Sequence, residues 1–251
     1  MLAAERRDFL LERLARDGKI VAKDVAAQLH LSEDSVRRDL RDLAAAGLCQ
    51  RVYGGALPVS PAMADYATRT TVEPGSKSRV AARAAQLVRP GATVILDGGT
   101  TTLAVVGALP SDLQCTVITH SPTIAVALLE RPAVDVFLLG GRLFRHSAVA
   151  CGAVAVEAAQ EVSADLFLLG VTGVHPEHGL TTGDPEEAAM KRALAARAAD
   201  TYVLASAEKV GAVSPYRVLP LTDVAGVVTD TASDNPTVRS LRDLGARLLN
   251  A

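Results

Sequence analysis

Three arginines are spaced so that they would share one face of a helix. Residues 32–43 read SEDSVRRDLRDL, and at about 100° per residue Arg37, Arg38 and Arg41 fall opposite an apolar stripe. A guanidinium group suits phosphate oxygens and guanine edges better than any other side chain. The spacing therefore favours nucleic-acid binding, although the solvated charged face of an ordinary surface helix would show the same pattern.

The segments before this helix indicate how it would be presented. Apolar periodicity predicts a first helix over 4–17 and a second over 22–29, and residues 30–32 form a three-residue turn into the arginine helix. Two short helices joined by such a turn make a helix-turn-helix, in which the second helix reads the major groove.

A small hairpin is expected directly after the arginine helix. Residues 48–56 read LCQRVYGGA, and the Gly54-Gly55 pair permits a tight turn. Three helices followed by a hairpin predict a winged helix-turn-helix that binds DNA. We expect the DNA contacts to come from Ser35, Arg37, Arg38, Arg41, Arg51, Tyr53 and Gly54.

A second stretch with chemistry of its own is DGGTTT at residues 97–102. Gly98 and Gly99 let the backbone turn sharply into a helix, so amides, helix dipole and threonine hydroxyls would converge on an anion. Lys209, near another strand end, would supply a countercharge. The alternative is a plain strand-to-helix turn, because short glycine-rich turns are weak motifs.

Short apolar runs alternate with helical segments from residue 77 onward, which predicts an α/β domain with a mainly parallel sheet. In such sheets, ligands bind beyond the carboxyl ends of the strands. We expect strands at 93–96, 116–119, 135–139, 166–169, 202–205 and 226–229, and helices near 77–88, 102–109, 122–130, 153–162, 185–199 and 235–244. The chain then divides into a DNA-binding domain (1–57), a Pro-rich linker (58–76) and the α/β domain (77–251).

Composition restricts the class of protein. The net charge of the 251 residues is −2, and residues 1–57 hold 10 basic against 9 acidic side chains, so any DNA footprint must be local. The three cysteines form no paired motif, which disfavours disulfides and a zinc site and favours a reducing compartment. His175 and His178 lack a third ligand nearby, so neither a metal nor a cofactor is expected. With no signal peptide or membrane span in the sequence, we expect a cytoplasmic protein.

Taken together, these stretches resemble the DeoR family of bacterial transcriptional regulators over nearly the whole chain. The resemblance implies a repressor of a carbohydrate-catabolism operon that a phosphorylated sugar relieves, and a sensor fold related to ribose-5-phosphate isomerase. The matching motifs are ERRDFLLERLARDGKI, LSEDSVRRDLRDLAAAGL and RVYGGA near the N-terminus, and LDGGTTT, ITHS, LLGGRLF, FLLGVTG, GLTT, MKRAL and SAEKVG further on.

The resemblance and the strand ends indicate the same effector site. Two positions depart from the usual family pattern: Ser206 stands where the family has an aspartate, and His120 stands where an asparagine is common. We expect the phosphate to be held by Asp97, Gly98, Gly99, Thr100, Thr101 and Thr102 with Gly141, Arg142 and Lys209, and the sugar to be lined by His120, Ser121 and Thr172.

A sugar-phosphate isomerase is the competing hypothesis. The isomerases carry acidic active-site residues where this chain has Thr172 and Gly173, neither of which can transfer a proton. Glu186 and Glu187 follow later, but a binding pocket without catalysis is the better interpretation. Because a reader of two-fold operators is usually dimeric, a homodimer or higher homo-oligomer is expected, with the Ala-rich helices as core or subunit contacts.

Overall fold

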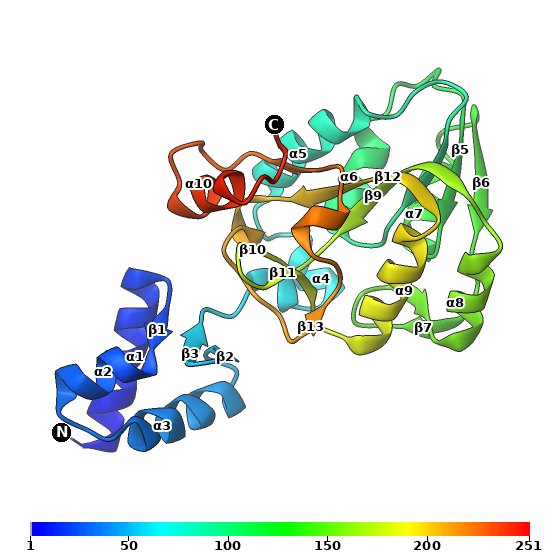
Figure 1. Ribbon diagram of the computed structural model, residues 1–251. Coiled ribbons are helices and arrows are strands. Elements are labelled where there is room, and N and C mark those ends of the chain that lie inside the picture. The colour runs from blue at the N-terminus through cyan, green and yellow to red at the C-terminus, as the bar shows by residue number, and fades with distance from the viewer. Residues whose placement is uncertain (1) are drawn as a thin grey trace.

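The computed structural model describes residues 2–251 and contains a small helical domain followed by a larger α/β domain (Figure 1). Leu10, Val25, Val36 and Leu40 are almost fully buried where the three N-terminal helices meet. The winged helix-turn-helix prediction is therefore confirmed. Its elements are α1 (Ala3–Asp17), β1 (Ile20–Val21), α2 (Ala22–Leu29), α3 (Glu33–Ala45), β2 (Gln50–Val52) and β3 (Gly55–Leu57).

The two wing glycines have different roles. Gly54, with a φ of 79°, lies in the turn between β2 and β3, in the left-handed region that favours glycine. Gly55 belongs to β3, which pairs with both β1 and β2, and a Cβ at this position would lie 1.7 Å from the carbonyl oxygen of Ile20. Gly55 is therefore required for close strand packing and not, as the sequence indicated, for the turn.

The larger domain is organised around one seven-stranded sheet in which every neighbouring pair is parallel. The strand order is β15-β14-β12-β9-β4-β5-β6. The strands are β4 (Thr93–Leu96), β5 (Cys115–Thr119), β6 (Val134–Leu138), β9 (Ala164–Gly170), β12 (Ala198–Ala205), β14 (Gly226–Thr229) and β15 (Leu248–Asn250).

Helices cover both faces of this sheet (Figure 1). Alternate residues along each strand point to opposite faces, so Leu168 packs into one core and Phe167 into the other. Helices α5, α6 and α7 contribute to the first core, and α8, α9 and α10 contribute to the second. Their bounds are α5 (Pro74–Ala85), α6 (Thr100–Ala108), α7 (Pro122–Leu128), α8 (Ala153–Gln160), α9 (Pro185–Ala195) and α10 (Pro236–Asp243).

Several short elements were not expected from the sequence. A three-stranded antiparallel sheet and a two-stranded ribbon lie in what looked like loops, because strands of two to four residues are too short to show periodicity. The expected helix 185–199 also ends earlier, since β12 already starts at Ala198. Edge strand β15 of the large sheet was not expected either. The other added elements are β7 (Arg142–Phe144), β8 (Val149–Cys151), β10 (Gly173–His175), β11 (Gly179–Thr182), β13 (Tyr216–Arg217) and the 3-10 turns η2 (Ala207–Lys209) and η3 (Leu221–Asp223).

Residues 58–76, expected to form an irregular linker, are packed against the α/β domain. They contain the 3-10 turn η1 (Pro61–Met63), the short helix α4 (Tyr66–Arg69) and the start of α5. Ser60 is buried and its hydroxyl donates to the carbonyl oxygen of Thr172 at 2.5 Å. Two of the prolines that indicated a linker, Pro61 and Pro74, instead start a turn and a helix, at the N-terminal positions where proline is tolerated. None of the helices in residues 2–251 is both long and apolar enough to span a membrane.

Candidate functional site

The arginine face of α3 is exposed, as the helical spacing predicts. Arg37, Arg38 and Arg41 are all exposed, while Val36, Leu40 and Leu43 pack into the domain core. Ser32 caps the helix by accepting a hydrogen bond from the amide of Ser35 at 3.2 Å. Arg37 pairs with Glu33 one turn earlier at 2.7 Å, and the other two arginines have no acidic partner within 4 Å in residues 2–251.

The acidic side chains on the flank of α3 form ion pairs within the N-terminal domain. Asp39 is buried and pairs with Arg6, and Asp42 pairs with Arg7, both arginines lying on α1. These pairs hold α1 against α3 and neutralise carboxylates that would otherwise repel a phosphate backbone. The exposed surface of α3 therefore carries a positive face.

The wing extends this positive face. Arg51, Tyr53 and Gly54 are exposed, and a groove between α3 and the wing is lined by Arg37, Arg51, Tyr53 and Lys23. Lys23 was not singled out in the sequence because it lies on α2, away from the recognition helix. Its exposed position within the groove makes it a further candidate phosphate contact.

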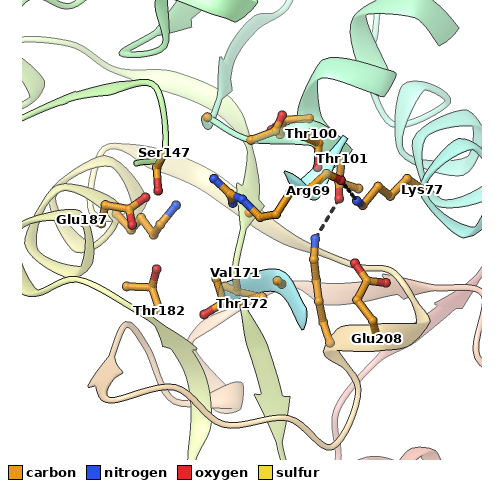
Figure 2. Close-up of a pocket in the computed structure, with 17 residues that line it drawn as sticks. Arg69, Lys77, Thr100, Thr101, Ser147, Val171, Thr172, Thr182, Glu187 and Glu208 are labelled. Atoms are coloured by element: carbon orange, nitrogen blue, oxygen red, sulfur yellow. Dashed lines mark hydrogen bonds between the residues drawn. The ribbon is translucent and has the colours of Figure 1, made fainter. Parts of the chain in front are cut away.

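A pocket lies at the carboxyl ends of β4, β9 and β12, next to the first turn of α6 (Figure 2). No side chain caps α6, so the amides of its first turn have no side-chain acceptor. The structure brings seven of the expected effector residues into this wall: Gly98, Gly99, Thr100, Thr101, Thr102, Thr172 and Lys209.

Three cations in the pocket wall lack a carboxylate partner. Arg69, Lys77 and Lys209 form no ion pair within 4 Å in the described chain. The ammonium of Lys209 donates to the Thr101 hydroxyl at 2.8 Å, and that of Lys77 donates to the carbonyl oxygen of Arg69 at 2.5 Å. Burial lowers the pKa of Lys209 to about 8. Glu187 and Glu208 also line the pocket, so four cations, Lys191 included, share the wall with two carboxylates. The remaining positive charge is suited to an anion.

Asp97, expected to touch the effector, lies behind the pocket and does not line it. The carboxylate is fully buried and accepts hydrogen bonds from the ammonium of Lys191 at 2.6 Å and from the amides of Gly98 and Gly170, both at 2.8 Å. Burial alone would raise the pKa of Asp97, but Lys191 and His120 reverse this and lower it to about 2. All its acceptor capacity is used within the protein, so its role is to fix the loop and Lys191.

His120 and Ser121 are also outside the pocket wall. The two ring nitrogens of His120 lie 2.8 Å from the Ala150 carbonyl oxygen and from the Asp97 carboxylate. The Ser121 hydroxyl donates to the carbonyl oxygen of Ala148 at 3.2 Å. The departure from the family pattern at His120 therefore lies in the packing behind the pocket.

Gly141 and Arg142 are placed further away. Gly141 packs against α8, where a Cβ would lie 2.8 Å from that of Ala155. Arg142 is exposed and pairs with Glu186 on α9. These two expectations were wrong because the loop after β6 turns away to form β7 instead of ending at the pocket.

Several pocket residues were missed in the sequence. Arg69 lies in the segment interpreted as a linker, and Ser147 comes from a loop that carried no motif. Thr182 ends β11 within the GLTT motif but was not singled out as a site residue. A spacing signal did exist for Glu187 and Lys191, which are one turn apart on α9. The missed lining residues with polar side chains are Arg69, Lys77, Ser147, Thr182, Glu187, Lys191 and Glu208.

No group of three or more metal-ligating side chains occurs among residues 2–251. The rings of His175 and His178 lie with their centres 4.9 Å apart. The three cysteines are buried and free.

Comparisons with known proteins identify both domains. Residues 6–62 match the model of the DeoR-like helix-turn-helix domain, and residues 73–231 match that of the DeoR C terminal sensor domain. Among solved structures, ribose 5-phosphate isomerase A of Methanocaldococcus jannaschii aligns over 53% of this chain and 52% of that chain, with 18% identity and a TM-score of 0.40. A score at this level supports no inference, so the relation to that isomerase stays a prediction.

The similarity to curated proteins extends over the full chain. The HTH-type transcriptional regulator GlpR of Haloferax volcanii is 31% identical, with 100% of this chain and 98% of that protein covered. The HTH-type transcriptional repressor GlcR of Bacillus subtilis is 30% identical, with 99% and 96% covered. The glycerol-3-phosphate regulon repressor of Escherichia coli is 25% identical, with 97% of each chain covered. These relatives are regulators and not enzymes, and the chain belongs to the DeoR family of DNA-binding transcriptional regulators.

Proposed function

We propose that this regulator represses a carbohydrate-catabolism operon and that a phosphorylated sugar bound in the C-terminal pocket relieves the repression. The observation that carries the proposal is the set of three cations, Arg69, Lys77 and Lys209, which line the pocket without carboxylate partners. The names of the relatives agree, since one of them is a glycerol-3-phosphate regulon repressor.

The pocket has two chemically different ends (Figure 2). One end carries Lys77, Lys209 and the first turn of α6 together with the carboxylate of Glu208, and its net positive charge fits a phosphate dianion. The other end carries Ser147, Thr182 and Glu187. Lys191 lines the pocket one turn after Glu187 on α9, and these oxygens and its ammonium can exchange hydrogen bonds with sugar hydroxyls. A sugar monophosphate has one group for each end, whereas an unphosphorylated sugar leaves the buried cations without an anion.

Operator recognition in this proposal uses the exposed face of the N-terminal domain. Arg38 and Arg41 reach base edges and phosphates from α3, with Ser35 and Arg37 beside them. Arg51, Tyr53 and Gly54 of the wing contact the flanking backbone, and Lys23 adds a phosphate contact.

A homodimer or higher homo-oligomer is part of the proposal, because a two-fold operator requires two recognition helices. Edge strand β6 supports this, since Phe137 and Leu138 are 54% and 50% exposed on a strand with one unpaired side. This edge strand belongs to the C-terminal domain.

The test is a band-shift of the pure protein on the DNA upstream of its own gene at fixed salt. It is repeated with glucose 6-phosphate, fructose 1-phosphate, fructose 6-phosphate, ribose 5-phosphate, glycerol 3-phosphate, inorganic phosphate and the matching unphosphorylated sugars. We expect specific binding that one monophosphate releases and its unphosphorylated form does not. Specific binding that none of the monophosphates changes would contradict the effector proposal, and no specific binding would contradict the operator proposal.

A further inference from the structure

Arg69 belongs to the segment between the two domains, yet its side chain points into the middle of the pocket. Figure 2 shows the guanidinium between Thr100 and Thr101 on one side and Ser147 and Glu187 on the other. Its Nε and Nη2 atoms are buried and have no hydrogen-bond partner among residues 2–251. A buried N–H group without an acceptor costs about 1–3 kcal/mol, and more when it is charged. An oxyanion at this point would accept from both atoms.

Three of the hydrogen bonds that attach the segment carrying Arg69 to the α/β domain lie next to the pocket. The Ser60 hydroxyl donates to the carbonyl oxygen of Thr172, a pocket residue. The amide of Tyr66 donates to the carbonyl oxygen of His146 at 2.8 Å, and the following residue, Ser147, lines the pocket. Lys77 donates to the carbonyl oxygen of Arg69. A shift of the segment therefore changes the pocket wall, and a change in the wall shifts the segment.

The path from this segment to the DNA-reading surface is short. Strand β3 of the wing ends at Leu57, and Val59 already bridges to Val213 of the α/β domain. The anchor at Ser60 follows one residue later. Only Pro58 separates the end of the wing from the first contact with the sensor domain, so movement of the anchor acts directly on the wing.

We propose that Arg69 binds the anionic group of the effector and that its movement couples occupancy of the pocket to the position of the wing. This inference rests on the proposed function, because it requires an anionic effector in the same pocket. A ligand shifts a conformational equilibrium only by its differential affinity for the two states. Lys77 and Lys209 hold the anion in either state, whereas Arg69 moves with the segment and supplies the differential contact.

The proposal gives Lys209 and Arg69 different roles, whereas in a simple binding site both cations would contribute only to affinity. Lys209 belongs to the sensor domain, within η2, and its loss weakens binding of the anion without changing the coupling. Arg69 belongs to the interdomain segment, and its loss removes the coupling even when the pocket is saturated. Arg69→Gln and Lys209→Gln are matched variants, since each replaces one cation of the pocket with the same neutral amide.

The experiment measures the operator dissociation constant of wild type, Arg69→Gln and Lys209→Gln with and without saturating monophosphate. The monophosphate is the member of the panel above that releases the wild type best, and its saturating concentration is set for each variant by calorimetry. Coupling energies of this kind typically change affinity about 5- to 150-fold. We expect the wild-type factor in Lys209→Gln at a higher concentration of monophosphate, and a factor below about two in Arg69→Gln.

Each outcome is decisive. Full release of Arg69→Gln at saturation overturns the coupling role, while a wild type that no monophosphate releases contradicts the proposed function itself. If Arg69→Gln is unfolded by circular dichroism or does not bind the monophosphate, Arg69→Lys provides the same test with the charge retained. Its shorter, point-charge donor reproduces neither guanidinium contact, so we expect saturable binding with reduced release. Unchanged release in Arg69→Lys would overturn the proposal.

Discussion

The two ends of this molecule use cations in opposite ways. Arg38 and Arg41 of α3 are exposed, whereas Lys209 and Lys191 of the pocket are almost entirely buried. An exposed cation costs little to keep and acts through contacts that salt screens. A buried cation is costly unless an anion accompanies it, so each one must be compensated by the protein or by a ligand.

In the proposed function, this difference suits one end to binding DNA and the other to distinguishing among small anionic molecules. Exposed arginines attract any phosphate backbone and distinguish sequences only through base contacts. The pocket pairs Lys191 with Asp97, whereas Arg69, Lys77 and Lys209 form no ion pair within 4 Å in residues 2–251. The two carboxylates in the wall, Glu187 and Glu208, are fewer than its cations. The charge that the protein does not supply is what a phosphorylated effector would bring.

The largest expected effect comes from removing a buried countercharge. Asp97→Ala leaves Lys191 buried without its anion, and we expect a loss of about 3–5 kcal/mol in the free energy of unfolding of the C-terminal domain. Urea denaturation followed by circular dichroism measures it. The matched variant Asp42→Asn breaks the exposed pair with Arg7 and should cost less than about 1 kcal/mol.

Lowering the pH should remove the stabilisation that Asp97 provides in the wild-type protein. The folded pKa of Asp97, about 2, lies below the value of about 3.9 for an unfolded chain. The stabilisation it provides is therefore present above about pH 4 and is lost as the pH falls toward 2. Equal losses for Asp97→Ala and Asp42→Asn would contradict the distinction between buried and exposed pairs.

The next effect tests the exposed end. Arg38→Ala should weaken operator binding by about 1–3 kcal/mol, or about 5- to 150-fold, and reduce discrimination against unrelated DNA. Fluorescence anisotropy at fixed salt measures both affinities. Arg89→Ala removes an equally exposed arginine from the C-terminal domain and should leave both unchanged. If Arg89→Ala had the same effect as Arg38→Ala, net charge and not the α3 face would govern binding.

The smallest effect is a difference in pH dependence between the two ends. Because burial lowers the pKa of Lys209 to about 8, the pocket loses a positive charge above that pH. Affinity for the monophosphate should then fall by up to about tenfold for each further pH unit, and Lys209→Gln should flatten this dependence. Operator affinity without monophosphate should stay constant from about pH 7 to 9, because guanidinium groups do not titrate there. A wild-type monophosphate affinity that is constant across pH 8 would exclude a role for Lys209 in binding.

Sequence alone was sufficient where contacts are local. The spacing of Val36, Leu40 and Leu43 determines which face of α3 is buried, and so it also determines where the arginines point. The alternation of short apolar runs with helices likewise predicted the parallel sheet, and Gly98 to Thr102 were correctly placed at a strand end. In each case the residues that determine the local structure lie close together in the sequence.

The rest of the pocket was not predictable in this way. Arg69 and Lys209 are 140 positions apart in the sequence and meet only because the interdomain segment packs across the sheet. Arg142, in contrast, follows a strand end as expected, but β7 carries it to the surface. Which strand-end residues reach a pocket depends on loop geometry, and periodicity contains no information about it.

The coupling between the pocket and the DNA-reading face is tested most directly by measuring whether it is reciprocal. Calorimetry would measure the affinity of wild-type protein for the releasing monophosphate, first alone and then with saturating operator DNA. Linkage requires the operator to weaken monophosphate binding by the same factor by which the monophosphate weakens operator binding. We expect equal factors well above one, and a monophosphate affinity that operator DNA leaves unchanged would contradict the coupling of pocket and DNA-reading face.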